Sequence, residues 1–230
     1  MNLSDIDVLI LAGGKGKRLR SVVKNKPKPM AEIGGRPFLD FLILHLKKKG
    51  FTRVIICTGY MADKIHKYYQ RKNMGIDIKF SGEEKPLGTG GAIKNAFKYI
   101  KSDPFVVING DSFCGIDYTK FLRFHLKNKA LATIALVKVK NDKKDFGSIE
   151  KDMSGRITNF REKIVSKSAW INAGGYLFSK KILELIPKDK QFSLEYQLFP
   201  NLHNCFGFAG NHVFVDIGTP EGLKKAGEIL

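Results

Sequence analysis

The sequence has few of the features that mark secreted, metal-clustered or membrane-spanning chains. Its three cysteines, Cys57, Cys114 and Cys205, are scattered without metal-ligand spacing, which predicts a reducing compartment where they act as small apolar residues. No apolar run approaches the roughly 18 residues that a membrane span needs. Residues 1–7 lack a basic region followed by an apolar stretch, so we expect no secretory signal. These absences predict a cytoplasmic protein without a membrane partner.

Acidic residues are also scarce, since 22 Asp and Glu stand against 40 Lys and Arg, for a formal net charge of +18. Such a balance first indicates a nucleic-acid binder. However, the lysines are spread through every segment, and runs such as residues 47–49 are typical of solvated helix faces. We find neither a helix-turn-helix pattern nor basic strands interleaved with aromatic residues. We therefore expect no nucleic-acid partner, and we expect the charge to attract anionic small molecules.

Apolar strands alternate with amphipathic helices along the first part of the chain. Strands are predicted at residues 8–11, 54–58, 76–81, 105–109 and 131–139, and helices at 37–49, 62–71, 91–100 and 118–127. The strand at 105–109 is almost wholly apolar, as expected in a sheet that is covered on both faces. This order predicts an α/β fold with a doubly wound, mostly parallel but mixed, Rossmann-like sheet.

The pattern changes after residue 140, although no repeat, low-complexity tract or linker separates the two parts. We expect a hairpin from 147–150 and 157–160, strands at 174–179 and 213–217, and helices at 180–186 and from about residue 220. We therefore predict a single domain over 1–230. Residues 1–140 would bind the first substrate, and residues 141–230 would form the acceptor side of the cleft.

A glycine-rich loop follows the first strand directly, with the sequence Gly13-Gly14-Lys15-Gly16-Lys17-Arg18-Leu19. Glycines allow main-chain N–H groups to close around an anion, and the basic side chains add countercharge. The loop lacks the third glycine of the dinucleotide fingerprint, because position 19 is Leu, and it lacks the Gly-Lys-Ser/Thr ending of an ATPase P-loop. The pattern nevertheless predicts a polyphosphate site, with Arg18 available for bidentate contact with phosphate.

Two aspartates follow apolar strands far apart in the chain, Asp111 after residues 105–109 and Asp216 near the end of 213–217. Carboxylates at the carboxyl ends of strands lie where α/β proteins bind ligands, and Mg²⁺ takes one or two carboxylates together with phosphate oxygens. The alternative is that either aspartate is a helix cap or turn residue. Lys28 lies between two prolines that restrict its backbone, so it is a candidate for contact with triphosphate oxygens.

The stretch from Gly88 to Gly91 has no side chains that would exclude a flat base, apart from Thr89, which offers a hydroxyl. We expect its backbone N–H and C=O groups to recognise the edge of a base. The alternative is an ordinary loop that leads into the next helix.

These motifs resemble those of the sugar-1-phosphate nucleotidylyltransferases. The shared opening is Leu-Ala-Gly-Gly-x-Gly-x-Arg-Leu at residues 11–19, followed by Pro-Lys-Pro-Met at 27–30. Further similar segments are 86–92, 109–111, 162–163, 172–175 and 215–220, so the resemblance spans almost the whole chain. It implies a nucleotidyltransferase fold of the GT-A-like type. It also implies Mg²⁺ as cofactor and a nucleoside triphosphate and a sugar 1-phosphate as substrates.

The resemblance implies the following site. The nucleotide would contact Leu11, Ala12, Gly13, Gly14, Lys15, Gly16, Arg18, Lys28, Pro86, Gly88, Thr89, Gly110 and Asp111. The sugar phosphate would lie near Asn109, Gly147, Glu162, Lys163, Asn172 and Gly175. Asp111 and Asp216 would bind the metal, and Arg18, Lys28 and Asp111 would be the catalytic residues.

Within this family, residues 26–30, 37–41 and 86–94 look most like the D-glycero-α-D-manno-heptose 1-phosphate guanylyltransferases, which favours GTP and a heptose 1-phosphate. Mannose-1-phosphate guanylyltransferases and uridylyl-, thymidylyl- or cytidylyltransferases are alternatives. A non-catalytic nucleotide-sugar sensor is an alternative of another class, although such proteins often lose the acidic metal ligands or the loop lysine, which this chain retains. The family includes homodimers, but no sequence feature identifies an interface here.

Overall fold

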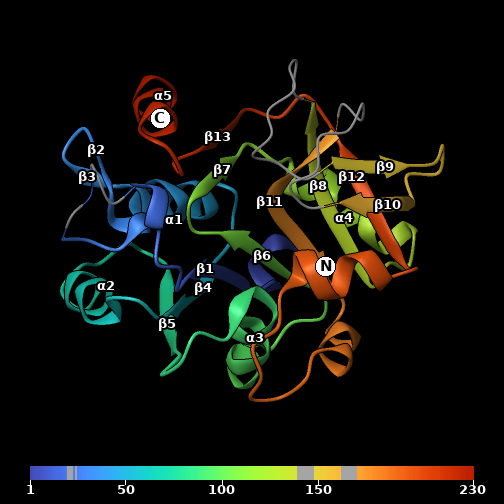
Figure 1. The fold of residues 1–230 in the computed structure, drawn as a ribbon, viewed down its shortest axis with the longest axis horizontal. Coiled ribbons are helices and arrows are strands. Elements are labelled where there is room, and N and C mark those ends of the chain that lie inside the picture. The colour runs from blue at the N-terminus through green and yellow to red at the C-terminus, as the bar shows by residue number, and fades with distance from the viewer. Residues whose placement is uncertain (20–22, 24, 139–147, 162–169) are drawn as a thin grey trace.

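The computed structural model describes residues 1–19, 23, 25–138, 148–161 and 170–230, and its centre is a mixed sheet of nine strands (Figure 1). The strand order is β10-β9-β11-β6-β1-β4-β5, while β8 pairs with β11 and with β12. The strands are β1 (Val8–Ala12), β4 (Arg53–Thr58), β5 (Asp77–Gly82), β6 (Phe105–Asn109), β8 (Ala132–Lys138), β9 (Ser148–Lys151), β10 (Ile157–Arg161), β11 (Trp170–Phe178) and β12 (Cys205–Ala209). This arrangement confirms the predicted α/β class.

Strands β6, β1, β4 and β5 form a parallel core in which Val8 lies opposite both Val54 and Val106. Because parallel strands point the same way, their carboxyl ends meet at one edge of the sheet. The loops that follow β1, β4, β5 and β6 therefore gather there, where open α/β sheets bind their ligands.

Helices cover both faces of this core. Val8 and Ile10 on β1 belong to one buried cluster, together with side chains of α1, α2, α4 and α5, whereas Leu9 belongs to a second cluster with side chains of α3. The helices are α1 (Phe38–Lys48), α2 (Ala62–Tyr69), α3 (Gly88–Asn95), α4 (Tyr118–Lys127) and α5 (Pro220–Ile229). Burial on both faces is the physical reason that β1 and β6 are apolar along nearly their whole length.

The later part of the sheet is organised by β11, which runs antiparallel to β6, β8 and β9. The predicted hairpin is confirmed by the antiparallel pairing of β9 and β10. The predicted start of the strand at residue 174 is wrong, because β11 begins at Trp170. Its pairing with β8 shifts register between Asn172 and Tyr176, and the glycines within that interruption resemble a turn in the sequence.

Several short elements were not predicted from the sequence. They are the pair β2 (Glu32–Ile33) with β3 (Arg36–Pro37), the strands β7 (Ser112–Cys114) and β12, and a π-helical turn at Leu194–Leu198. The strand β13 (Phe214–Asp216) confirms the prediction at 213–217, although its pairing with β7 was not predicted. Elements this short leave little hydrophobic periodicity to detect. The helix predicted at 180–186 is instead a 3-10 helix over Lys180–Leu185, and α3 starts three residues earlier than expected and continues as a 3-10 turn at Ala96–Tyr99.

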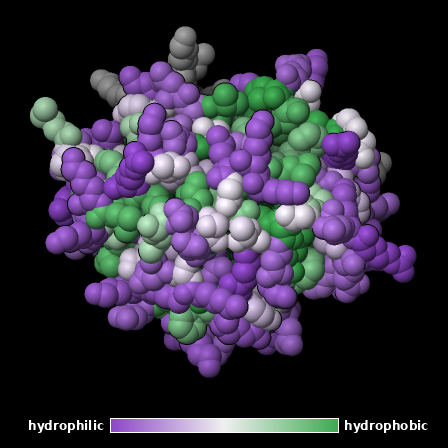
Figure 2. All heavy atoms as spheres, turned by 180° about the vertical axis from the view of Figure 1, so that it is seen from behind, coloured by the Kyte–Doolittle hydropathy of each residue, from purple (hydrophilic) through white to green (hydrophobic). Residues whose placement is uncertain are grey.

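Hydrophilic and apolar side chains are mixed on the surface. Seen from behind, hydrophilic side chains spread over the whole visible face, with apolar side chains showing between them (Figure 2). In the part of the chain that the structure describes, no helix combines the length and apolar character needed to cross a membrane.

Candidate nucleotide and metal site

A cavity of about 930 Å³ opens at the carboxyl ends of the parallel strands. Most of the nucleotide contacts expected from the sequence line it. These residues are Leu11, Ala12, Gly13, Gly14, Lys15, Gly16, Arg18, Lys28, Pro86, Gly88, Thr89 and Asp111, together with Asn109 from the expected sugar-phosphate set. The structure thus brings together segments that are separated by about 100 positions in the chain.

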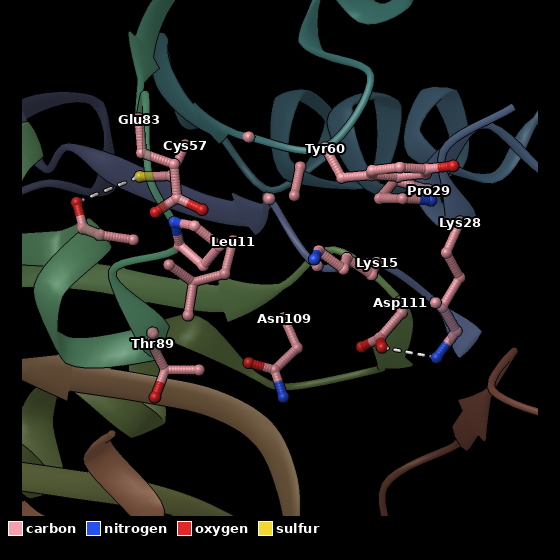
Figure 3. A pocket seen from close by; sticks show the side chains of 18 of the residues that line it. Leu11, Lys15, Lys28, Pro29, Cys57, Tyr60, Glu83, Thr89, Asn109 and Asp111 are labelled. Atoms are coloured by element: carbon pink, nitrogen blue, oxygen red, sulfur yellow. Dashed lines mark hydrogen bonds and ion pairs between the residues drawn. The ribbon is translucent and has the colours of Figure 1, made fainter. Parts of the chain in front are cut away.

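The cavity has two chemically different ends (Figure 3). Leu11, Cys57, Glu83 and Thr89 lie toward one end, whereas Lys28 and Asp111 lie at the other. The first end offers apolar surface and the Glu83 carboxylate, and the second offers a cluster of opposite charges. A ligand with a flat ring at one end and phosphate groups at the other matches this division.

The glycine-rich loop approaches Lys28 closely. Gly16 has a positive φ of +56°, and a Cβ atom at this position would lie 2.9 Å from Cβ of Lys28. A larger residue at position 16 would therefore meet both backbone strain and a steric conflict. Lys28 itself begins a 3-10 turn, Lys28–Met30, in which the Ala31 N–H donates to the Lys28 carbonyl at 3.0 Å. The glycine-rich loop and Lys28 therefore pack directly against each other.

Lys28 lies between the two predicted metal-binding aspartates. Its Nζ atom lies 2.6 Å from Oδ2 of Asp111 and 3.8 Å from Oδ1 of Asp216, and its side chain is only 9% exposed. Pairing of β7 with β13 places Asp216 opposite Ser112, the neighbour of Asp111. The Ser112 Oγ atom lies 3.3 Å from Asp111 Oδ1 and 3.2 Å from Asp216 Oδ2. The two carboxylates therefore face the same point, as expected from the sequence.

The local electrostatics favour binding of a cation. Burial raises the pKa of Asp216, and the nearby negative charge of Asp111 raises it further. Lys28 and the hydrogen bonds from Gly218 N–H and Ser112 Oγ act in the opposite direction. A carboxylate with a raised pKa is one whose negative charge is incompletely compensated, so added positive charge beside Asp216 stabilises its ionised form.

The two carboxylates suit a hard divalent cation. Carboxylate oxygens are the ligands that Mg²⁺ prefers, and Mg²⁺ commonly takes its remaining ligands from water and phosphate oxygens. Among the described residues, no group of three or more His, Cys, Asp or Glu side chains is arranged to hold a metal. Asp111 and Asp216 therefore suit a cation that completes its coordination with water and phosphate oxygens.

The glycine-rich turn at the other end of the cavity differs from expectation. Gly90 and Gly91 were expected to leave their backbone groups open to a base, but both N–H groups donate to the Phe192 carbonyl, at 2.9 and 3.1 Å. A Cβ atom at Gly90 would lie 2.7 Å from the Phe192 ring. These glycines therefore accommodate a later segment of the chain, and only Gly88 and Thr89 of this turn line the cavity.

The remaining predicted residues lie around the cavity or outside the described part of the chain. Gly110 donates its N–H to the Leu11 carbonyl at 2.9 Å and so joins the ends of β6 and β1. Asn172 donates to the Tyr176 hydroxyl at 2.9 Å, and Gly175 lies on β11 against Ile116. Neither Asn172 nor Gly175 lines the cavity. Gly147, Glu162 and Lys163 lie outside the described residues.

Sequence reasoning did not identify several residues that line the cavity. They are Pro29, Cys57, Gly59, Tyr60, Glu83, Glu84, Lys85, Ala92, Gln191 and Gly218. Some of them could have been identified from their positions after predicted strands. Gly59 and Tyr60 follow the end of β4, and Glu83 follows the end of β5, just as the glycine-rich loop follows the end of β1. Applying the strand-end rule to every parallel strand would have selected these residues.

Burial shifts the pKa of two of these residues, Glu83 and Cys57. The Glu83 carboxylate is partly buried, which raises its pKa, and its Oε2 atom accepts a hydrogen bond from Leu87 N–H at 3.1 Å. Cys57 is buried, and its burial raises the pKa of the thiol to about 12. At neutral pH this thiol is protonated, in agreement with the expectation that the cysteines act as apolar residues.

Comparison with known proteins agrees with this geometry. The model of the nucleotidyl transferase family matches residues 7–228. A D-glycero-α-D-manno-heptose 1-phosphate guanylyltransferase from Aneurinibacillus thermoaerophilus is 38% identical over 224 residues, which cover 96% of each chain. A mannose-1-phosphate guanylyltransferase from Mycobacterium tuberculosis is 35% identical over 232 residues, which are 98% of this chain but 64% of that relative.

A solved structure has the same fold over almost the whole chain. The crystal structure of HddC from Yersinia pseudotuberculosis complexed with GMP-PN superposes with a TM-score of 0.87 and 42% sequence identity. The match covers 97% of this chain and 99% of that chain.

Proposed function

This chain belongs to the nucleotidyl transferase family, and we propose that it transfers GMP from GTP to D-glycero-α-D-manno-heptose 1-phosphate, releasing pyrophosphate. The observation that carries the proposal is the position of Lys28 between Asp111 and Asp216, at the end of the cavity that the glycine-rich loop also lines. Similarity to the heptose 1-phosphate guanylyltransferase over 96% of each chain supports the choice of base and sugar.

The reaction needs little proton chemistry. A phosphate oxygen of the sugar 1-phosphate attacks the α-phosphorus of the nucleotide in line, and pyrophosphate leaves. The attacking oxygen is already anionic, so no general base is required. The main obstacle is repulsion between two anions, and positioning together with charge neutralisation therefore supplies most of the catalysis.

The chain's own residues supply that neutralisation. Lys28 and Arg18 line the cavity with Lys15 and are assigned to the triphosphate oxygens. Lys28 is nearly buried, so its charge acts where solvent screens it less than at the surface. Asp111 and Asp216 are the residues that would hold Mg²⁺, and Mg²⁺ when bound supplies further positive charge to the phosphates.

Glu83 supports guanine as the base. Guanine presents an exocyclic amino group that donates hydrogen bonds, whereas adenine lacks a donor at this position. Glu83 lies at the apolar end of the cavity, and one carboxylate oxygen is engaged by Leu87 N–H. The other oxygen is an acceptor for such a donor. Leu11 and Ala92 line the same cavity and provide apolar contact for the ring.

The sugar side is assigned by analogy with the relatives. Asn109 lines the cavity beside Asp111, and a Cβ atom at Gly174 would lie 2.8 Å from its amide nitrogen. We assign Asn109, Asn172, Gly175, Gly147, Glu162 and Lys163 to the region that receives the sugar phosphate. The similarity to the Mycobacterium tuberculosis enzyme makes mannose 1-phosphate the second candidate substrate.

A substrate matrix tests the proposal. Four nucleoside triphosphates are combined with heptose, mannose, glucose and N-acetylglucosamine 1-phosphates in the presence of Mg²⁺, and pyrophosphate release is measured. We expect the highest kcat/KM for GTP with the heptose phosphate. A preference for mannose 1-phosphate would select the second candidate. GTP binding without turnover of any sugar phosphate would contradict the enzymatic function and favour a nucleotide-sugar sensor.

A further inference from the structure

The N-terminal turn of α3 forms part of the cavity wall, yet it has no capping side chain of its own. The preceding residue, Leu87, makes no side-chain cap, and Gly88 has a positive φ of +73°. The first turn of a helix leaves backbone N–H groups without intrahelical partners, so they need acceptors from elsewhere. In this protein the acceptor for two of them comes from a segment about 100 residues later in the chain.

That segment is Phe192–Glu195, which precedes and begins the π-helical turn Leu194–Leu198. The Phe192 carbonyl accepts from Gly90 and Gly91, and the Phe192 N–H donates to the Leu87 carbonyl at 2.8 Å. The neighbouring Gln191 lines the same cavity as Gly88. The later segment thus supports the turn through the backbone on both sides of Gly88.

A side-chain network completes this attachment. The Thr89 hydroxyl donates to Glu195 Oε2 at 2.7 Å and accepts from the Leu194 N–H at 2.9 Å. The Ser193 hydroxyl donates to the same Glu195 oxygen at 2.8 Å. Thr89 lines the cavity, so its hydroxyl connects the cavity wall to a carboxylate that does not line the cavity.

We infer that Glu195 is a positioning residue for the nucleotide. It holds Thr89, and through it the first turn of α3, against the end of the cavity assigned to the base. The inference rests on the proposed nucleotidyl transfer and extends it, since nothing in the phosphate chemistry requires Glu195. Loss of the carboxylate should therefore weaken nucleotide binding more than it slows turnover.

The test compares Glu195→Ala and Glu195→Gln with the wild type. We expect Glu195→Ala to raise the KM for GTP, or for the nucleotide that the substrate matrix selects, by about tenfold, because a hydrogen bond to a charged acceptor is lost. The kcat and the KM for the sugar phosphate should stay within about threefold. Glu195→Gln keeps a carbonyl oxygen as acceptor and should restore most of the affinity.

Two further variants separate positioning from general stability. Thr89→Val removes the hydroxyl at similar shape, and its effect combined with that of Glu195→Ala should be smaller than the sum of the two single effects, because both variants lose the Thr89–Glu195 hydrogen bond. Glu184→Ala, on the neighbouring 3-10 helix, removes an exposed carboxylate and should leave the KM values unchanged. Thermal unfolding of each variant confirms that the protein being assayed is folded.

The possible outcomes are distinct. An unchanged KM for the nucleotide in folded Glu195→Ala would overturn the inference, as would a failure of Glu195→Gln to restore affinity. A wild-type protein that binds GTP without releasing pyrophosphate would overturn the proposed function alone. The dissociation constant for GTP, measured by calorimetry, would then test Glu195 in place of KM. A wild-type protein that binds no nucleoside triphosphate would overturn both.

Discussion

Lys28 and Asp111, which are 83 positions apart in the chain, form an ion pair of 2.6 Å at the carboxyl-terminal edge of the parallel strands. The lysine comes from a turn between two prolines, and the aspartate comes from the end of β6. Asp216 lies 3.8 Å from the same ammonium group. The fold thus holds one ammonium group within 4 Å of two carboxylates, at the end of the cavity that the glycine-rich loop also lines.

We expect Lys28→Ala and Asp111→Asn each to lower kcat by at least ~100-fold, by analogy with the loss of one electrostatic stabiliser in other enzymes. Pyrophosphate release at saturating substrates measures the effect. Lys79→Ala is the matched control, because Lys79 is a lysine on the edge strand β5 that pairs with Asp77. Near-normal turnover of either variant would remove that residue from the catalytic mechanism.

Removal of divalent cations should abolish turnover. Asp111 and Asp216 supply only two carboxylates, so a metal that also relies on substrate oxygens is expected to exchange readily. Treatment with a chelator should stop pyrophosphate release, and added Mg²⁺ should restore it. Asp216→Asn should raise the Mg²⁺ concentration that gives half-maximal rate. Full activity in the chelator would contradict the assignment.

Glu83→Gln should lower the preference for GTP over ATP by about 10- to 100-fold, because the amide group offers a donor where guanine also presents one. The ratio of the two kcat/KM values is the measurement. Glu84→Gln is the natural comparison, since Glu84 is adjacent and lines the same cavity. If Glu84→Gln changes the ratio and Glu83→Gln does not, the base is recognised by the other carboxylate.

Acid should destabilise the fold through two histidines. Burial lowers the pKa of His125 to about 4, and burial together with Lys49 and Lys48 lowers the pKa of His45 to about 4. In the unfolded chain both rings titrate near 6.5, so between pH 6.5 and 4 the unfolded state binds more protons. The free energy of unfolding should therefore fall as pH falls through this window, by at most about 1.4 kcal/mol per pH unit for each histidine.

Urea unfolding at several pH values between 7 and 4.5 measures this slope. His125 is a suitable target because it is 3% exposed and its Nδ1 atom lies 2.8 Å from the Thr133 hydroxyl. A His45→Gln/His125→Gln variant should show a shallower dependence on pH, whatever its stability at pH 7. An identical slope in wild type and variant would exclude these rings as the source.

The strong periodic signals of the sequence predicted the parallel core and its covering helices. The short pairing of β7 with β13 could not be predicted, because three residues carry no useful periodicity and their partners lie about 100 positions apart. That pairing nevertheless brings Asp216 beside Asp111. The sequence argument for their proximity was that strand ends gather at one edge of the sheet, but this reason is wrong for Asp216, because β13 pairs with β7 in a separate two-stranded sheet.

The glycine-rich turn at residues 88–91 shows where sequence reasoning failed. A glycine-rich sequence is equally compatible with an open loop that binds a base and with a turn that packs closely against another segment. Only the structure shows that Gly90 and Gly91 face Phe192. Glu195 could not have been selected from the sequence, since its partner Thr89 lies 106 positions earlier. The oligomeric state, the cytoplasmic location and the roles of Gly147, Glu162 and Lys163 stay predictions.

The pairing of β13 with β7 has a consequence for substitutions away from the cavity. Asp216 ends β13, and its place opposite Ser112 depends on the three paired residues of each strand. Its neighbour Val215 is 2% exposed and belongs to the same buried cluster as Phe113, the residue opposite it. A substitution that loosens this packing would therefore separate the two carboxylates without altering any residue that lines the cavity.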